Sequence, residues 1–202
     1  REDRNIEFLK KTVTSEVEAI CATLDDLKAM YPEITLELSR DVKFVTSQEL
    51  YDMYPDKTPK ERENLFLAEN HTAFIMQIGG KLSSGERHDG RAPDYDDWTL
   101  NGDIMFWNEL LGCAFEISSM GIRVDADAMK KQLKEAGCED RAVLPFHKAL
   151  LSGELPLTMG GGIGQSRLSM LLLQKAHIGE VQVSIWDDNT KKICAENGIV
   201  LL

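Results

Sequence analysis

The sequence TMGGGIGQSRLSMLLL, residues 158–173, places glycines at the end of a short apolar segment and one arginine at the start of a strongly apolar helical stretch. Because glycine has no Cβ, the backbone can bend sharply there and a flat ligand can approach closely. Arg167 would lie in the first helical turn, where its planar cation could stack on a base and bind phosphate. An ordinary tight strand–helix turn is the alternative. The pattern is neither a Walker loop nor a dinucleotide fingerprint, and the acids described below favour ATP binding.

The composition is that of a soluble globular protein. The chain has 202 residues, of which 43% are hydrophobic and 28% charged, enough to bury a core in one domain. Its formal net charge of −11 makes a broad nucleic-acid contact unfavourable, because an acidic surface repels phosphates. No bilayer-spanning stretch or signal peptide is visible, so we expect a cytoplasmic protein without a membrane partner. The four cysteines are scattered without a Cys-x-x-Cys pair, which argues against a zinc site or a disulfide framework.

Hydrophobic spacing predicts a mixture of helices and strands. Apolar residues three and four apart predict a long helix over residues 5–30. Capping and proline signals predict further helices over residues 50–54, 59–69, 125–137, 141–152 and from the glycines to residue 174. Strands are expected over residues 36–45, 72–78, 103–107, 114–119 and 181–186. Because there is no regular βαβ alternation, the order favours an α+β fold with an antiparallel sheet.

Two acids lie in otherwise apolar strand segments. Asp103 and Glu116 would be costly to bury without a partner. Residues 108–112 form a plausible hairpin turn, and in a hairpin both acids can come close on one sheet face. Two facing carboxylates would bind Mg²⁺, which prefers oxygen ligands and keeps phosphates and waters in its shell. The alternative is that one acid faces solvent. Arg123 follows at the strand end beside these acids.

Residues 87–98, RHDGRAPDYDDW, form a dense polar loop. It is either a solvated turn or a loop that grips substrate, in which Arg91 would clamp a carboxylate and an aspartate would hold an ammonium group. The four histidines have no metal-ligand spacing, and no Ser–His–Asp signature is present. We expect His147 and His177 to be packed or surface residues.

Taken in order, these segments resemble the ammonia-dependent asparagine synthetases, or aspartate–ammonia ligases. The matching stretches are residues 44–50, 79–83, 88–98, 100–103, 115–127 and 160–173, of which 88–98 and 115–127 are the most specific. The last stretch also resembles the third signature motif of class II aminoacyl-tRNA synthetases. The resemblance implies a class II synthetase-like antiparallel sheet flanked by helices, working as a homodimer. It also implies that ATP, L-aspartate and ammonia are converted to L-asparagine, AMP and pyrophosphate.

The resemblance assigns roles by position. Nucleotide-binding positions are Asp103, Ile104, Glu116, Ser119 and Arg167, and Asp103 and Glu116 would hold Mg²⁺. Positions at the amino-acid end are Arg91, Asp96, Ser118, Arg123 and Gly162. Asp96, Arg123 and Arg167 would be the catalytic residues.

The sequence departs from the family pattern in two places. We expect residues 1–202 to form a single catalytic domain that lacks the N-terminal part of the family chain. The family also has a loop of several residues where Trp98 here meets Thr99 directly. Two alternatives therefore stay open: a catalytic-core fragment of an aspartyl- or asparaginyl-tRNA synthetase, or a non-catalytic remnant that binds aspartate and nucleotide. The acidic balance and the lack of a basic anticodon-binding module weigh against the first.

Overall fold

The computed structural model describes residues 3–202. It begins with the predicted long helix, α1 (Ile6–Met30), which is capped by the side chain of Asn5 accepting a hydrogen bond from the main-chain N–H of Phe8 at 2.9 Å. Apolar residues at helical spacing lie buried along one side of α1, from Leu9 to Leu24. The helix ends at Tyr31, directly before Pro32, as the proline predicts.

Five strands form one sheet in the order β1-β2-β3-β4-β5. Their bounds are β1 (Lys43–Thr46), β2 (Thr72–Met76), β3 (Asp96–Asn108), β4 (Cys113–Arg123) and β5 (Met159–Ile163). The predicted antiparallel pairing is confirmed for β2 to β5, whereas β1 and β2 are parallel. Parallel strands need a crossover, which α2 (Ser47–Met53) and α3 (Pro59–Asn70) supply here.

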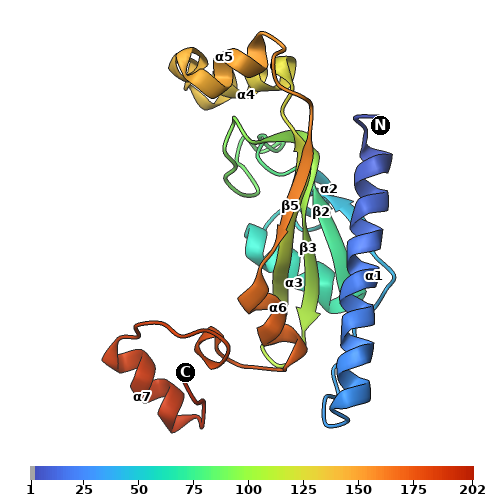
Figure 1. The fold of residues 1–202 in the computed structure, drawn as a ribbon, viewed down its shortest axis with the longest axis vertical. Helices are drawn as coiled ribbons and strands as arrows, with labels where there is room; N and C mark the ends of the chain where they lie inside the picture. The colour runs from blue at the N-terminus through green and yellow to red at the C-terminus, as the bar shows by residue number, and fades with distance from the viewer. Residues whose placement is uncertain (1–2) are drawn as a thin grey trace.

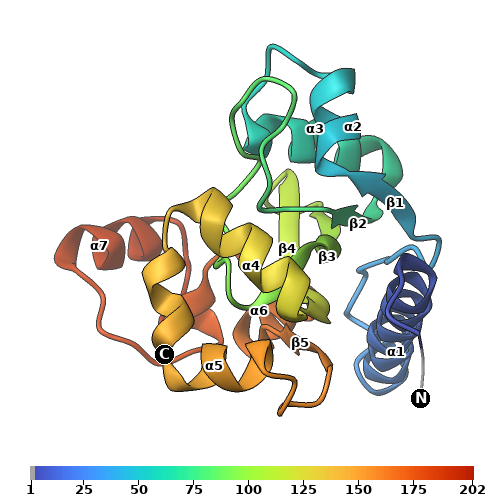
Figure 2. The same cartoon turned by 90° about the horizontal axis from the view of Figure 1, so that it is seen from above.

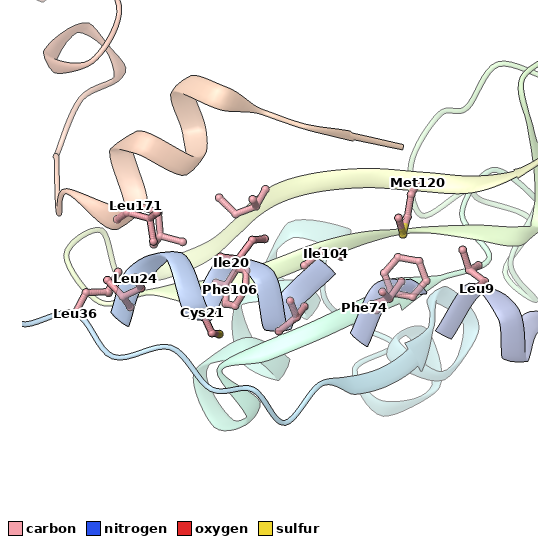
Figure 3. Packing of buried hydrophobic residues seen from close by; sticks show 14 of the residues in the cluster. Leu9, Ile20, Cys21, Leu24, Leu36, Phe74, Ile104, Phe106, Met120 and Leu171 are labelled. Carbon is pink, nitrogen blue, oxygen red and sulfur yellow. The ribbon is translucent and has the colours of Figure 1, made fainter. Parts of the chain in front are cut away.

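Helices cover the two sheet faces unequally (Figures 1 and 2). Helix α1 packs on one face, where Phe74, Ile104 and Phe106 form a core cluster with its apolar side chains (Figure 3). On the other face, Leu50 of α2 and Leu67 of α3 pack in a second cluster over the β1–β2 side. Polar residues of β3 and β4 lie on that second face beyond the cluster, and these form the candidate site.

A β-bulge interrupts the pairing of β3 with β4. Asp103 lies opposite Ser119 and Met105 lies opposite Glu116, so β4 contains one extra residue between these two pairs. Strict alternation would place residues 116 and 119 on opposite faces, because side chains alternate along a strand. The extra residue, with the buried Ile117 turned toward the α1 side, brings Glu116 to the face of Asp103. The predicted sharing of one face by the two acids is therefore confirmed.

The glycine-rich segment does not bend sharply as predicted. Gly160, Gly161 and Gly162 lie within β5, and none of them has a positive φ. The chain turns only at Gly164, the residue before α6 (Gln165–Leu172). The bend was wrongly placed because pairing with β4 holds the glycines extended.

Three further predictions need correction. Residues 181–186 are not a strand: Val183 and Ile185 are exposed, and Trp186 packs on His177 with ring centroids 4.8 Å apart. The alternating pattern does not produce a strand here, because among residues 3–202 no strand pairs with this segment. The strand predicted over residues 36–45 is confined to β1, because only its last part reaches β2. The helix predicted over residues 141–152 is split into η1 (Glu139–Val143) and α5 (Pro145–Leu151), because proline interrupts the helical hydrogen bonds.

The remaining helices lie at the two ends of the sheet. Helix α4 (Ala126–Ala136) and α5 lie at one end, and η2 (Ile178–Glu180) and α7 (Asp188–Glu196) lie toward the other (Figure 1). None of the helices formed by residues 3–202 has the length and apolar character needed to cross a membrane.

Candidate active site

A pocket of about 400 Å³ opens between β4, β5 and the start of α6. Its polar lining includes Glu116, Ser119 and Arg167. Arg167 is the third residue of α6, in the first turn as predicted, and its Nη1 lies 3.0 Å from Oε1 of Glu116. Both side chains are partly exposed, 49% and 36% respectively, so a ligand can reach them. The arginine and one of the two acids are thus brought together.

Glycines of β5 lie beside β4 at this pocket. Gly162 lies opposite Ser119, and a Cβ built on it would meet none of the atoms of residues 3–202 within 4 Å. Gly160 leaves room for Arg123, because a Cβ there would lie 2.4 Å from its Nη2. Close approach of a flat group to the backbone is therefore possible at Gly162, whereas Gly160 accommodates a side chain of the protein.

Asp103 is the most deeply buried acid of the site. Its side chain is 4% exposed and forms an ion pair with Arg91, while its Oδ1 has no hydrogen-bond partner among residues 3–202. Burial raises its pKa to about 6; Arg91 opposes this shift, and the charge of Glu116 adds to it. The effect of the Glu116 charge on Asp103 indicates that the two carboxylates lie in one electrostatic environment.

The donor set fits the magnesium ion that the resemblance implies. Within residues 3–202 no group of three or more His, Cys, Asp or Glu side chains could hold a metal ion, so the acids could supply only part of a coordination shell. Asp103 and Glu116 share one face, and one Asp103 oxygen is buried without a partner. Such an incomplete carboxylate set suits Mg²⁺, which completes its shell with substrate phosphates and water.

The raised pKa of Asp103 predicts a pH-dependent stability in metal-free protein. The unfolded carboxyl ionises near pH 3.8 but the folded one near pH 6, so ionisation costs folding free energy as the pH rises between these values. Asn cannot ionise. The free energy of unfolding of Asp103→Asn, relative to the parent protein, should therefore increase by about 2 kcal/mol from pH 4 to pH 8.

Urea unfolding in EDTA at several pH values measures this difference. Asp89→Asn is the matched control, since Asp89 also pairs with Arg91 but is 62% exposed. The control should follow the parent profile. Parallel profiles for Asp103→Asn and the parent would show that Arg91 keeps Asp103 ionised at acidic pH.

A second polar group lies beside the first, at the ends of β3 and β4. Arg123 forms an ion pair with Asp96 and donates a hydrogen bond to the Tyr95 hydroxyl at 2.9 Å. Its guanidinium also stacks on the Tyr95 ring, with Cζ 3.9 Å from the ring centroid. Burial raises the pKa of Asp96, against the effects of Arg123 and Arg91. The charge of Arg91 thus acts on both Asp96 and Asp103, which links the two groups electrostatically.

Two of the predicted site residues point away from this face. The Ile104 side chain is fully buried in the core beneath α1. The Ser118 hydroxyl is also buried on that side, close to Glu16 of α1, whose pKa is raised by burial. Any contact of Ile104 or Ser118 with a ligand on the pocket face would have to involve main-chain atoms.

The structure adds residues that sequence reasoning missed. The buried Gln132 of α4 accepts a hydrogen bond from the Trp98 N–H at 2.9 Å and donates to the carbonyls of Pro93 and Asp96 at 2.9 and 3.0 Å. The sequence could have indicated this role, because Gln132 lies on the apolar face of α4, where a buried polar side chain needs hydrogen-bond partners. Tyr95 gave no signal, because nothing in the loop sequence links it to Arg123. His147, which was expected to be a packed or a surface residue, is buried.

The model of the aspartate-ammonia ligase family, AsnA, matches residues 1–198. The chain belongs to this family. It is 57% identical over 202 residues to the aspartate–ammonia ligase of Clostridium perfringens strain 13, covering 100% of this chain and 60% of the relative. It is 52% identical to the Fusobacterium nucleatum enzyme of the same name, covering 100% of this chain and 62% of the relative. The chain thus spans about three-fifths of the length of the curated relatives it matches.

Solved structures with a similar fold are class II aminoacyl-tRNA synthetases. The aspartyl-tRNA synthetase of Entamoeba histolytica has a TM-score of 0.61 and 18% identity, covering 93% of this chain and 42% of its own. Asparaginyl-tRNA synthetase of Pyrococcus horikoshii, complexed with asparaginyl-adenylate, has a TM-score of 0.55 and 15% identity, covering 85% of this chain and 42% of its own. The predicted fold class is confirmed by this likeness.

Proposed function

We propose that this chain carries the catalytic site of an ATP-dependent ligase that converts L-aspartate and ammonia to L-asparagine, AMP and pyrophosphate. Membership of the aspartate-ammonia ligase family supports the reaction. The single structural observation that carries the proposal is the β-bulge in β4, which gathers Asp103, Glu116 and Ser119 on one face beside Arg167. Acids and an arginine in one pocket suit phosphate chemistry.

The first step activates a carboxylate that ammonia cannot attack directly. A side-chain oxygen of aspartate forms a bond to the α-phosphorus of ATP, while the bond from that phosphorus to the bridging oxygen breaks and pyrophosphate leaves. Arg167 would stack on adenine and contact phosphate, and Ser119 would help to hold the phosphate. Arg123 would bind a carboxylate or the developing negative charge.

In this proposal, Asp103 and Glu116 would bind a magnesium ion. When bound, it would neutralise phosphate charge during the transfer. Each of these acids pairs with an arginine, Asp103 with Arg91 and Glu116 with Arg167. Since a guanidinium group also binds phosphate, Arg167 has an alternative partner when ATP enters.

In the second step, ammonia attacks the carbonyl carbon of the β-aspartyl-adenylate and the bond to AMP breaks. Asp96 would hold the substrate ammonium or accept the proton lost by the attacking nitrogen. Its raised pKa supports the second role, because a carboxylate with a higher pKa is a stronger base. Arg91, in the same loop as Asp96, would bind a substrate carboxylate.

Assembly into a homodimer and a cytoplasmic location remain predictions.

The experiment that tests the proposal measures asparagine, AMP and pyrophosphate formed by the full-length protein from aspartate, ATP, Mg²⁺ and ammonium. We expect the three products in equal amounts, with none formed without aspartate. Transfer of aspartate or asparagine to tRNA would instead favour a synthetase. Thermal stabilisation by ATP and aspartate without any product would favour a non-catalytic remnant.

A further inference from the structure

The loop of residues 88–97 contributes Arg91 and Asp96 to the candidate site, yet its middle lies at the surface. Asp89, Gly90 and Ala92 are exposed. His88, Pro93, Asp96 and Asp97 are buried, and on either side of the exposed residues a buried histidine contacts a carboxylate. These two contacts fall outside the site residues described above.

At the first end, His88 is held by α3. The His88 ring is 1% exposed, and its Nε2 lies 3.1 Å from Oε1 of Glu63, whose side chain is 11% exposed. Lys60 contacts the other oxygen of Glu63 at 3.0 Å. Burial acts to raise the pKa of Glu63, but the hydrogen bond from His88 and the charge of Lys60 bring it below its ordinary value. The carboxylate is therefore ionised when His88 contacts it, three residues before Arg91.

At the second end, the loop is held by a histidine of another element. The His147 ring of α5 is 7% exposed, and its Nε2 lies 3.0 Å from Oδ2 of Asp94. Arg141 of η1 contacts the same oxygen at 3.1 Å. Asp94 directly precedes Tyr95, which stacks on Arg123, and lies two residues before Asp96. A shift of Asp94 would therefore move both groups that orient Arg123.

We propose that His88 and His147 are positioning residues that fix the two ends of loop 88–97, so that Arg91 and Asp96 stay at the amino-acid end of the site. In each ring Nε2 faces a carboxylate, and Nδ1 is buried with no partner among residues 3–202. A neutral ring with its proton on Nε2 satisfies this arrangement, because it donates to the carboxylate without burying a second unpaired N–H. The part that concerns substrate rests on the proposed function.

The chemistry selects the test variants. Glutamine carries an amide N–H₂ at about the distance of histidine Nε2 and can restore the donor, whereas leucine fills similar space without one. In the full-length protein, His147→Leu and His88→Leu should each raise the KM for aspartate on the order of tenfold and leave the KM for ATP unchanged, because misplacement by an ångström is costly. His147→Gln and His88→Gln should retain KM values close to the parent. His71→Asn is the matched control, an exposed histidine 3.8 Å from Glu109.

A second readout does not depend on activity. Trypsin cleavage after Arg91 reports local opening of the loop, because proteases cut segments that leave their folded contacts. Both leucine variants should be cut there at least severalfold faster than the parent protein, and the glutamine and control variants at the parent rate. If the parent makes no asparagine, the proposed function fails, while the cleavage rates still decide whether the histidines hold the loop.

The positioning proposal is overturned by any of three results. The leucine variants could keep the parent KM and cleavage rate. The glutamine variants could behave like the leucine variants although both melt near the parent temperature, which would exclude the hydrogen bond. Finally, the KM values for aspartate and ATP could rise together with a lower melting temperature, which would indicate general destabilisation.

Discussion

Glu116→Gln should lower kcat/KM for aspartate-dependent pyrophosphate release by about a hundred- to a thousandfold, the usual loss when one strong electrostatic contact to a transition state is removed. The substitution keeps the shape of the side chain but removes the charge that would hold a divalent cation beside Asp103. It also removes the partner 3.0 Å from Arg167. Pyrophosphate release at saturating ATP, measured over a range of Mg²⁺ concentrations, gives the effect.

The same variant should unfold at nearly the parent temperature. Glu116 and Arg167 are each more than one-third exposed, and such ion pairs contribute little to stability. Glu109→Gln, at the exposed hairpin turn between β3 and β4, is a suitable control and should remain fully active. A Glu116→Gln protein with parent activity and parent Mg²⁺ dependence would remove Glu116 from the metal assignment.

Arg123→Lys should reduce asparagine formation by about a hundredfold although it preserves the positive charge. Arg123 contacts Asp96 and the Tyr95 hydroxyl from different nitrogens and stacks on the Tyr95 ring, which a planar guanidinium can do at once. A lysine ammonium is one point charge and cannot reproduce the three contacts. Steady-state rates with each substrate varied in turn give the magnitude.

An independent change tests the same geometry without altering Arg123. Gly160→Ala adds a methyl group that would lie 2.4 Å from Nη2 of Arg123, so the guanidinium must move. We expect a loss of at least tenfold in asparagine formation from this displacement. Gly80→Ala is the control for backbone effects, because its methyl group enters open space within the described structure and Gly80 does not line the pocket of the candidate site. Equal rates for the parent and Gly160→Ala would mean that the position of Arg123 is not critical.

The arrangement of charges explains why the site can be built into the folded protein. Each of the three acids contacts one arginine, in the pairs Asp103–Arg91, Glu116–Arg167 and Asp96–Arg123. Burying a carboxylate alone would be costly, and pairing reduces that cost. Burial still raises the pKa of Asp103 to about 6 and shifts that of Asp96 upward. Keeping these two carboxylates ionised therefore lowers the free energy of unfolding, although the proposed chemistry needs their charge.

Elements whose signals are local could be predicted from the amino-acid sequence. The spacing of apolar residues defines α1, because one helical face must be buried. Pro59 after Thr58, with Glu61 completing a capping box, defines the start of α3. Arg167 falls in the first turn of α6 because the apolar stretch begins there. These features depend on neighbouring residues, so they could be predicted without knowing what packs against them.

How the segments pack against one another could not be predicted in this way, because it depends on contacts between residues far apart in the sequence. The bulge that turns Glu116 toward Asp103 arises from the register between two strands, and alternation alone would place the residues opposite Asp103 and Met105 on different faces. The prediction of a strand over residues 181–186 is wrong because, in the described part of the chain, no sheet edge pairs with this segment. His147 and Asp94 are 53 residues apart in sequence. The sequence thus determines what each segment can form, whereas which side chains face one another depends on non-local packing, which no local pattern encodes.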